Sequence, residues 1–175
     1  MKAPESTVEG QTVGSSKLLL YFHANAEDIG LSYQLLDTIR SNMKINVLAP
    51  EYPGYGIYRS LRHKNGQKSG EAHCSSQQIK EDAECVYDFI MSTFPNIEEK
   101  DLILYGRSMG SGPVVHLASN RSPGAVILMS AYTNVKSVVY EKFGFLSALF
   151  NEQFDNLELM SKIKSPTMII HGKKD

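Results

Sequence analysis

The sequence from Leu102 to Gly112 reads LILYGRSMGSG, and this stretch decides the fold. Its first four residues have the apolar character of a buried strand and run directly into a Gly-x-Ser-x-Gly motif centred on Ser108. The next residues, PVVHLA at 113–118, are typical of a helix. A strand, a tight turn and a helix are the context of a nucleophile elbow, which holds a reactive serine above the edge of a sheet.

The geometry of the turn explains why both residues at the ends of this motif are glycines. A turn this tight forces Ser108 into a strained backbone conformation, and a side chain at Gly106 or Gly110 would collide with the neighbouring strand or helix. The alternative is a glycine-rich strand-to-helix turn without chemistry. Two other glycine motifs are excluded, because Pro-Val-Val follows Gly112 where dinucleotide-binding spacing would continue, and no Gly-Lys-Ser/Thr of a phosphate-binding loop follows.

The composition is that of one ordinary globular domain. The chain has 175 residues, of which 42% are hydrophobic and 21% charged, with a net charge of −1, and this is enough for a single core. Near-neutrality and scattered Lys and Arg argue against nucleic acid as a partner. No apolar run has the length of a membrane span, and the first residues lack the apolar core of a signal peptide. We therefore expect a cytoplasmic protein.

The two cysteines fit a reducing compartment better than a disulfide framework. Cys85 falls on an expected helix and is predicted to lie in the core. Cys74 follows His73, but no second pair at ligand spacing accompanies them, so we expect no metal site.

Strand and helix patterns alternate along the chain. Residues 1–16 are polar and rich in Gly, Ser and Thr, which predicts a disordered lead-in. A single core then occupies 17–175, with a small cap-like segment of helical pieces at 131–162. Expected strands cover 17–23, 45–50, 101–105, 125–129 and 167–171. Three helices are expected. The first has an apolar face of Leu31, Leu35, Leu36, Ile39 and Met43, and the third covers 109–120. The second follows a cap at Ser75 and has an apolar face of Ile79, Ala83, Val86, Phe89 and Ile90.

This alternation predicts an α/β fold with a mostly parallel, doubly wound sheet and helices on both faces. In such sheets ligands bind beyond the carboxyl ends of the strands. The segments of distinctive polar composition each fall at such an end: 23–28, 51–58, 106–110, 130–134 and 171–175. Their convergence favours a site at this edge more strongly than any one motif does.

Together these residues resemble the α/β-hydrolases. The matching pieces are FHANAED at 22–28, where the family reads His-Gly-Asn-Ala, with YPGYG at 52–56, YGRSMG at 105–110, FDNL at 154–157 and HGKKD at 171–175. More narrowly, they are similar to the serine hydrolases that include the protein depalmitoylases of the α/β-hydrolase-domain group. The resemblance implies the α/β-hydrolase fold, which this chain would carry incomplete at both ends.

The resemblance also implies roles for four residues. Ser108 would be the nucleophile, and Asp175 the acid that orients a catalytic histidine. The backbone N–H groups of Met109 and Asn25 would form the oxyanion hole, which agrees with the general mechanics of the elbow. The reaction would be hydrolysis of an ester or thioester of a small-molecule, lipid or lipidated-protein acyl substrate, without a metal or organic cofactor. Peripheral membrane contact and the oligomeric state stay open.

Two departures from the family pattern matter. The family's Gly is Ala24 here, and alanine resists positive φ by about 1–2 kcal/mol, so the second oxyanion donor would be displaced if that position needs φ > 0. The chain order of nucleophile, acid and histidine would place a histidine after Asp175, the last residue. We therefore expect part of a longer hydrolase; the alternatives are a catalytically dead binding or scaffold protein and a serine peptidase of the same fold.

The histidines of the chain are weak candidates for the base. His23 ends a strand beside the elbow strand and is the one with a path to Ser108, although the family uses that histidine to orient the loop. The others are expected to be structural or surface residues: His63, His73, His116 and His171.

Two further features of the site region have alternative interpretations. Arg107, inside the elbow, is expected to make a surface ion pair rather than to pair with a carboxylate near the site. Tyr52, Tyr55 and Tyr58 would either wall an acyl channel or pack on their own Pro-Gly turn.

Overall fold

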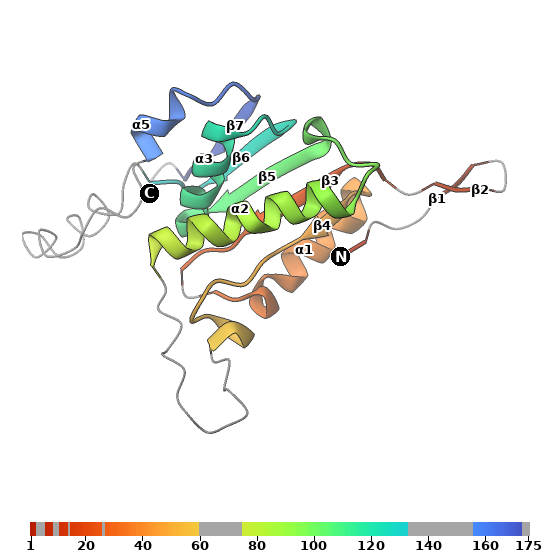
Figure 1. The fold of residues 1–175 in the computed structure, drawn as a ribbon. Coiled ribbons are helices and arrows are strands. Elements are labelled where there is room, and N and C mark those ends of the chain that lie inside the picture. The colour runs from red at the N-terminus through yellow and green to blue at the C-terminus, as the bar shows by residue number, and fades with distance from the viewer. Residues whose placement is uncertain are drawn as a thin grey trace, which may run out of the picture.

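The computed structural model describes residues 1–2, 6–8, 11–13, 15–25, 27–59, 75–132 and 156–172. Its centre is a five-stranded sheet in which each neighbouring pair is parallel, as predicted (Figure 1). The strand order is β4-β3-β5-β6-β7, with β3 at Leu18–Phe22, β4 at Asn46–Leu48, β5 at Leu102–Arg107, β6 at Ala125–Met129 and β7 at Thr167–Ile170.

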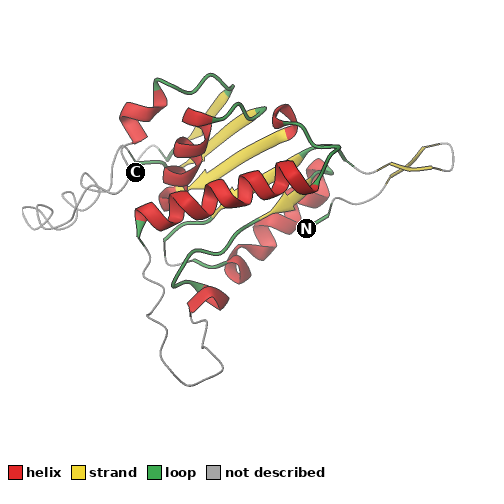
Figure 2. Ribbon diagram, viewed as in Figure 1, coloured by secondary structure: helices red, strands yellow, loops and turns green. Residues whose placement is uncertain are grey.

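Helices cover both faces of this sheet, which confirms the doubly wound arrangement (Figure 2). α1 packs on one face, and α2 and α3 pack on the other. Within the described ranges, none of the helices combines the length and the apolar character that a membrane span requires. The helices are α1 at Ile29–Met43, α2 at Ser76–Thr93, α3 at Ser111–Asn120 and α5 at Asn156–Met160, with short 3-10 helices η1 at Gly56–Arg59, η2 at Glu99–Asp101 and η3 at Ser108–Gly110.

The strand β3 explains why its sequence is one continuous apolar run. Leu18, Leu20 and Phe22 belong to the core cluster beneath α2 and α3. Leu19 and Tyr21 belong to the second cluster, beneath α1. All five side chains are buried because a central parallel strand is covered on both faces.

The sheet changes its direction of winding at β3. From β3 the chain moves to β4 on one side, and after α2 it returns to β5 on the other side, from which β6 and β7 follow outward. The carboxyl ends of β3 and β5 therefore border the crevice where open α/β sheets bind ligands. The loop that begins at His23 and the turn at Ser108 both start at this point.

The predicted apolar face of α1 is wrong in part. Leu36 is buried against the sheet, whereas Leu31 and Met43 are 71% and 56% exposed. At 3.6 residues per turn, Leu31 points to nearly the opposite side of the helix from Leu36. The spacing therefore identified the helix correctly but gave it too wide a buried stripe.

The prediction for α2 also needs correction. Ser75 caps this helix as expected, because its Oγ accepts the Gln78 N–H at 3.1 Å. However, Phe89 is 54% exposed and Cys85 is exposed rather than in the core. The buried line of α2 consists of Ile79, Ala83, Tyr87 and Ile90, and positions 85 and 89 lie away from that line at helical spacing.

The amino-terminal segment predicted as a disordered lead-in contains two short described strands. β1 at Ser6–Val8 and β2 at Gln11–Val13 pair as an antiparallel sheet of their own. Valine and threonine favour extended strands. Most of the cap-like segment predicted at 131–162 lies outside the described residues; its described parts are 131–132 and 156–162.

Candidate active site

The turn after β5 has the geometry that its sequence predicts. Ser108 follows the strand directly and has φ = +48°, a left-handed conformation that strains any residue with a Cβ. A Cβ on Gly106 would lie 2.3 Å from the Gly110 carbonyl oxygen, and a Cβ on Gly110 would lie 2.1 Å from the Phe22 carbonyl oxygen. Both positions therefore require glycine, and the turn closes directly onto the end of β3.

A chain of hydrogen bonds supports the underside of this turn. The Ser111 hydroxyl donates to the Ser108 carbonyl oxygen at 2.7 Å, and the Asn156 amide donates to Ser111 Oγ at 3.1 Å. The same Asn156 amide donates to the Tyr132 carbonyl oxygen at 2.9 Å. Because Asn156 is buried, these bonds fix the strained turn from the protein interior.

The loop after β3 lies beside the turn. The parallel register pairs Phe22 with Gly106, so the two segments leave the sheet next to each other. The Tyr55 hydroxyl donates to Asn25 Oδ1 at 2.6 Å and lies 3.9 Å from Met109 Sδ. The structure thus brings together Asn25, Met109 and Ser108, three of the four predicted site residues. Among the described residues, the backbone N–H of Asn25, in the loop after β3, and that of Met109, in η3, donate no hydrogen bond to a group outside these two turns.

The substitution of alanine for glycine at position 24 causes no backbone strain. The non-glycine residues with positive φ in the described ranges are Lys44, Ser108 and Ser130. Ala24 is not among them, so a Cβ at this position does not displace the loop. Alanine at position 24 therefore gives no reason to expect that the Asn25 N–H is displaced from the predicted oxyanion hole.

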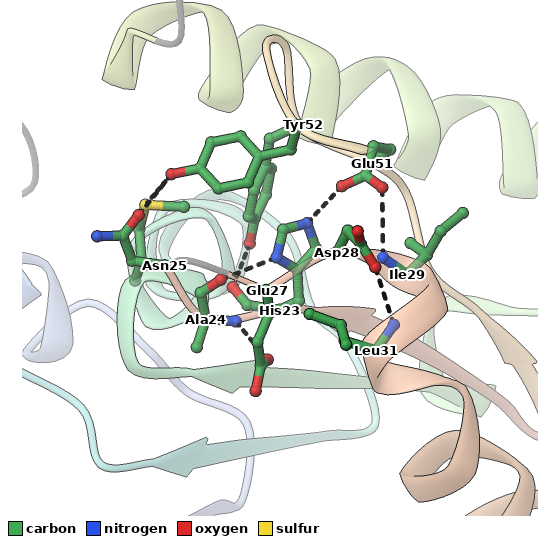
Figure 3. A network of polar contacts seen from close by, with 11 residues as sticks. His23, Ala24, Asn25, Glu27, Asp28, Ile29, Leu31, Glu51 and Tyr52 are labelled. Carbon is green, nitrogen blue, oxygen red and sulfur yellow. Dashed lines mark hydrogen bonds and ion pairs between the residues drawn. The ribbon is translucent and has the colours of Figure 1, made fainter. Parts of the chain in front are cut away.

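His23 is fully buried, and its ring is held on both sides (Figure 3). Nδ1 lies 2.9 Å from the Ala24 carbonyl oxygen, and Nε2 lies 2.8 Å from Glu51 Oε1. A carbonyl oxygen only accepts, so Nδ1 donates to it, and Nε2 is engaged by the Glu51 carboxylate. Both ring nitrogens are therefore held by groups other than Ser108, which argues against His23 as its base.

Glu51 and Tyr52 use this histidine to fix the loop. The second carboxylate oxygen of Glu51 accepts the Ile29 N–H at 3.3 Å at the start of α1. The Tyr52 hydroxyl donates to the His23 carbonyl oxygen at 2.9 Å, and its ring is buried against the imidazole. The segment after β4 therefore locks the loop after β3, and Tyr52 packs rather than lining a channel.

Relatives of this chain include curated proteins whose names give a fold family. The alpha/beta hydrolase domain-containing protein aho-3 of Caenorhabditis elegans is 29% identical over 157 residues, which are 90% of this chain and 43% of that protein. The human alpha/beta hydrolase domain-containing protein 17B is 30% identical over 157 residues, 90% of this chain and 49% of that protein. The chain thus spans about half the length of the curated relatives it matches. No family model matches it.

Solved structures agree at the level of the fold. FphF, a fluorophosphonate-binding serine hydrolase of Staphylococcus aureus, superposes with a TM-score of 0.62 at 19% identity, over 99% of this chain and 72% of that one. The thioesterase domain of the curacin biosynthetic pathway gives 0.60 at 16% identity, over 99% and 83%. This chain has the α/β-hydrolase fold.

Two histidines of this α/β-hydrolase fold besides His23 lie among the described residues. His116 pairs with Glu84 of α2 at 2.7 Å, as a packing residue would. His171 is exposed after β7. The remaining sequence candidates, His63, His73 and the predicted acid Asp175, fall outside the described residues.

Arg107 does not make the isolated surface ion pair that was expected. Its guanidinium pairs with Glu27, 80 positions earlier in the chain, in the loop beside the elbow. The other carboxylate oxygen of Glu27 accepts the Ala24 N–H at 3.1 Å. Arg107 therefore pairs with a carboxylate near the candidate site and connects two segments of it, which was the less favoured alternative.

Residues that the sequence did not single out complete the site. Glu51 lies just beyond the carboxyl end of β4, so a charged residue soon after an apolar strand was the available signal for its role. Glu27 and Asn156 had no comparable signal, because they contact residues that are distant in the sequence. Arg107 lies 80 positions from Glu27, and Ser111 lies 45 positions from Asn156. Burial raises the pKa of the Tyr132 hydroxyl well above its usual range, and this group donates to the Met109 carbonyl oxygen at 3.5 Å.

Proposed function

We propose that the full-length protein is a serine hydrolase that cleaves a carboxylic ester or thioester by two-step acyl transfer. The observation that carries the proposal is the conformation of Ser108, at φ = +48° between two glycines that admit no Cβ. A strained residue persists only where the surrounding structure holds it, and such residues cluster at active sites.

The first half of the reaction acylates the serine. Ser108 Oγ attacks the substrate carbonyl carbon while a histidine accepts its proton, and the carbonyl oxygen becomes an oxyanion. The backbone N–H groups of Met109 and Asn25 stabilise that charge, and each contributes about 3–4 kcal/mol to the transition state. Collapse of the intermediate expels the alcohol or thiol, which takes the proton back from the histidine.

The second half of the reaction releases the acyl group. Water attacks the acyl-serine carbonyl, the same histidine accepts the proton from water, and Ser108 leaves with that proton restored. Asp175 orients the histidine. We place this histidine after Asp175 in the full-length protein, because the order of nucleophile, acid and histidine is usual for elbow enzymes and His23 is already engaged by Glu51.

The substrate class we propose is an acyl thioester, which includes the acyl thioesters of lipidated proteins. The location we propose is the cytoplasm, with contact at membrane surfaces. Support comes from the similarity to alpha/beta hydrolase domain-containing proteins and from the fold shared with a thioesterase domain. Two of the pieces that resemble the depalmitoylases are joined by hydrogen bonds, because Tyr52 donates to the His23 carbonyl oxygen and Tyr55 donates to Asn25 Oδ1.

A second candidate is a binding protein that keeps the fold without the chemistry. It is favoured by one observation: within the described part of the chain, His23 is engaged on both sides and His116 is paired with Glu84. Loss of the base of a serine–histidine pair lowers kcat by about a millionfold, so this candidate predicts no turnover at all.

The deciding experiment is labelling of the full-length protein by a fluorophosphonate probe. We expect the wild type and Ser130→Ala to be labelled and Ser108→Ala to be unlabelled. Ser130 is the matched control because it is also a serine at φ = +48° that directly follows a strand of the same sheet. Equal labelling of wild type and Ser108→Ala would contradict the nucleophile assignment, and an inert wild type would favour the binding protein.

The substrate class is tested with matched pairs of acyl thioesters and oxygen esters of short and long chains. A thioesterase turns over the thioester of each pair with the higher kcat/KM. A preference for amides in a parallel peptide panel would assign a peptidase to the same fold.

A further inference from the structure

Glu27 uses both oxygens of its carboxylate to connect two separate segments of the site. Oε1 pairs with the Arg107 guanidinium, and Oε2 accepts the Ala24 N–H at 3.1 Å. The Glu27 N–H also donates to the Ala24 carbonyl oxygen at 3.3 Å, which closes the loop on itself. Figure 3 shows the Glu27 side chain reaching back to Ala24.

The two partners of Glu27 stand directly before two residues of the proposed chemistry. Arg107 precedes Ser108, and Ala24 precedes Asn25. One carboxylate therefore links the backbone that carries the nucleophile to the backbone that carries an oxyanion donor, across 80 positions of sequence.

The sheet alone does not set the distance between these groups. The ladder between β3 and β5 ends at the pair Phe22 and Gly106, and both segments continue beyond it as turns. We call the place where these two turns leave the sheet side by side the junction. On one side of it, Gly110 packs on the carbonyl oxygen of Phe22. The Glu27–Arg107 pair is a second contact between the two segments.

The surroundings of this pair reduce its exposure to water. The Glu27 and Arg107 side chains are 21% and 42% exposed. Tyr21 and Tyr105 pack edge to face at 5.1 Å, and the charges of both Glu27 and Arg107 act on their hydroxyls. Burial raises the pKa of both tyrosines, so they stay neutral and form an uncharged wall beside the pair. Freely exposed ion pairs contribute little because water screens them, and this pair is partly shielded.

We propose that Glu27 and Arg107 form a positioning pair that holds the oxyanion loop in register with the nucleophile. The inference rests on the proposed function and names residues that act through Asn25 and Ser108 without touching substrate. Misplacement by about 1 Å can lower a reaction rate by about a hundredfold. Loss of one of several constraints on this junction is expected to lower kcat by about tenfold.

The test is a double-mutant cycle in the full-length protein. Glu27→Gln keeps an oxygen to accept the Ala24 N–H but removes the charge, and Arg107→Met removes the other charge while keeping much of the side-chain volume. Arg107→Lys restores the charge. The matched control is Asp37→Asn, because the Asp37–Arg40 pair on α1 has side chains 40% and 24% exposed and lies in another part of the fold.

The readouts are kcat and KM for one ester, the rate of fluorophosphonate labelling and the melting temperature. We expect kcat and the labelling rate to fall by about tenfold in Glu27→Gln and in Arg107→Met, with KM and melting temperature nearly unchanged. The double variant should be no slower than either single variant, because both remove the same interaction. Arg107→Lys should recover most of the rate, and Asp37→Asn should stay within about twofold of wild type.

Each outcome decides the inference. Variants that all behave like Asp37→Asn, or single effects that multiply in the double variant, overturn the positioning pair while the serine hydrolase stands. A fall in melting temperature that accounts for the lost rate also overturns it, since the pair would then be structural only. An inert wild type overturns the proposed function, and the inference falls with it.

Discussion

Two serines of this chain share an unusual backbone conformation but differ in everything around it. Ser108 follows β5 and Ser130 follows the adjacent strand β6, and both have φ = +48°. The Ser130 N–H donates to the Ile170 carbonyl oxygen at 2.8 Å, so this residue extends the ladder to β7. Ser108 instead leaves its strand, begins η3, and has its carbonyl oxygen held by Ser111.

The comparison teaches that backbone strain alone does not identify a nucleophile. The two residues carry the same cost in φ, yet only Ser108 stands between glycines that admit no Cβ. It is also the one next to Asn25 and Met109, whose backbone N–H groups face a forming oxyanion in the proposed mechanism. What distinguishes the two sites is the set of groups that the surrounding fold brings to each.

Replacement of each serine by glycine separates strain from chemistry and gives the largest expected effect. Glycine adopts φ = +48° freely, which releases about 1–2 kcal/mol of strain, but it costs about 0.5–1 kcal/mol in the entropy of the unfolded chain. Both variants should therefore gain up to about 1.5 kcal/mol in the free energy of unfolding, measured with urea. Ser108→Gly should lower kcat by about a millionfold, whereas Ser130→Gly should keep it within about twofold. Equal loss of activity at both positions would erase the distinction.

Replacement of a glycine beside Ser108, and of one at the opposite end of β6 from Ser130, gives the next effect. In Gly110→Ala the new Cβ would lie 2.1 Å from the Phe22 carbonyl oxygen, and in Gly124→Ala, just before β6, it would lie 2.0 Å from the Lys100 carbonyl oxygen. Backbone must move in both, so each should lose about 2–3 kcal/mol in the free energy of unfolding. Only Gly110→Ala should also lose activity per folded molecule, measured as the labelling rate corrected for the folded fraction. Full activity in folded Gly110→Ala would show that the elbow tolerates displacement.

The smallest effect concerns Tyr132, which follows Ser130 but donates to the Met109 carbonyl oxygen of the elbow. Burial raises the pKa of its hydroxyl. The unfolded chain releases this proton near pH 10 while the folded chain keeps it, so above that pH the unfolded state binds fewer protons. This contribution to stability is full below about pH 10 and is lost as the pH rises further.

Tyr132→Phe should therefore flatten the alkaline decline in the free energy of unfolding measured from pH 9 upward. At pH 7 it should change stability by less than about 0.5 kcal/mol, because the 3.5 Å hydrogen bond that it removes is long. Identical alkaline slopes for the variant and the wild type would contradict the burial of this hydroxyl.

The parts of the fold that the sequence predicted are those determined by local patterns. The apolar run from Leu18 to Phe22 predicts a strand covered on both faces, and the glycines around Ser108 predict a tight turn. Neither conclusion needs knowledge of a distant residue. The same holds for the cap at Ser75, whose partner Gln78 lies one turn away.

The parts that the sequence missed depend on distant contacts. Helical spacing identified α2 but did not reveal that Tyr87 is buried and Phe89 exposed, since the sheet decides which side of a helix is covered. The roles of Glu27 and Glu51 were missed for the same reason. Their partners include Arg107 and His23, which lie 80 and 28 positions away.

The pairing of β3 with β5 also has a consequence for how the chain folds. Leu18 of β3 meets Leu102 of β5, so the two halves of the crevice belong to segments 84 positions apart. At synthesis rates of about 5–20 residues per second, β3 would leave the ribosome roughly 4–17 s before its central neighbour is made. Contacts between residues so far apart in the sequence form slowly, because the entropy of closing the loop is lost before the contacts contribute any stability. The crevice is therefore expected to be among the last features to assemble, and β3, apolar on both faces, is the segment that a chaperone would have to shield until then.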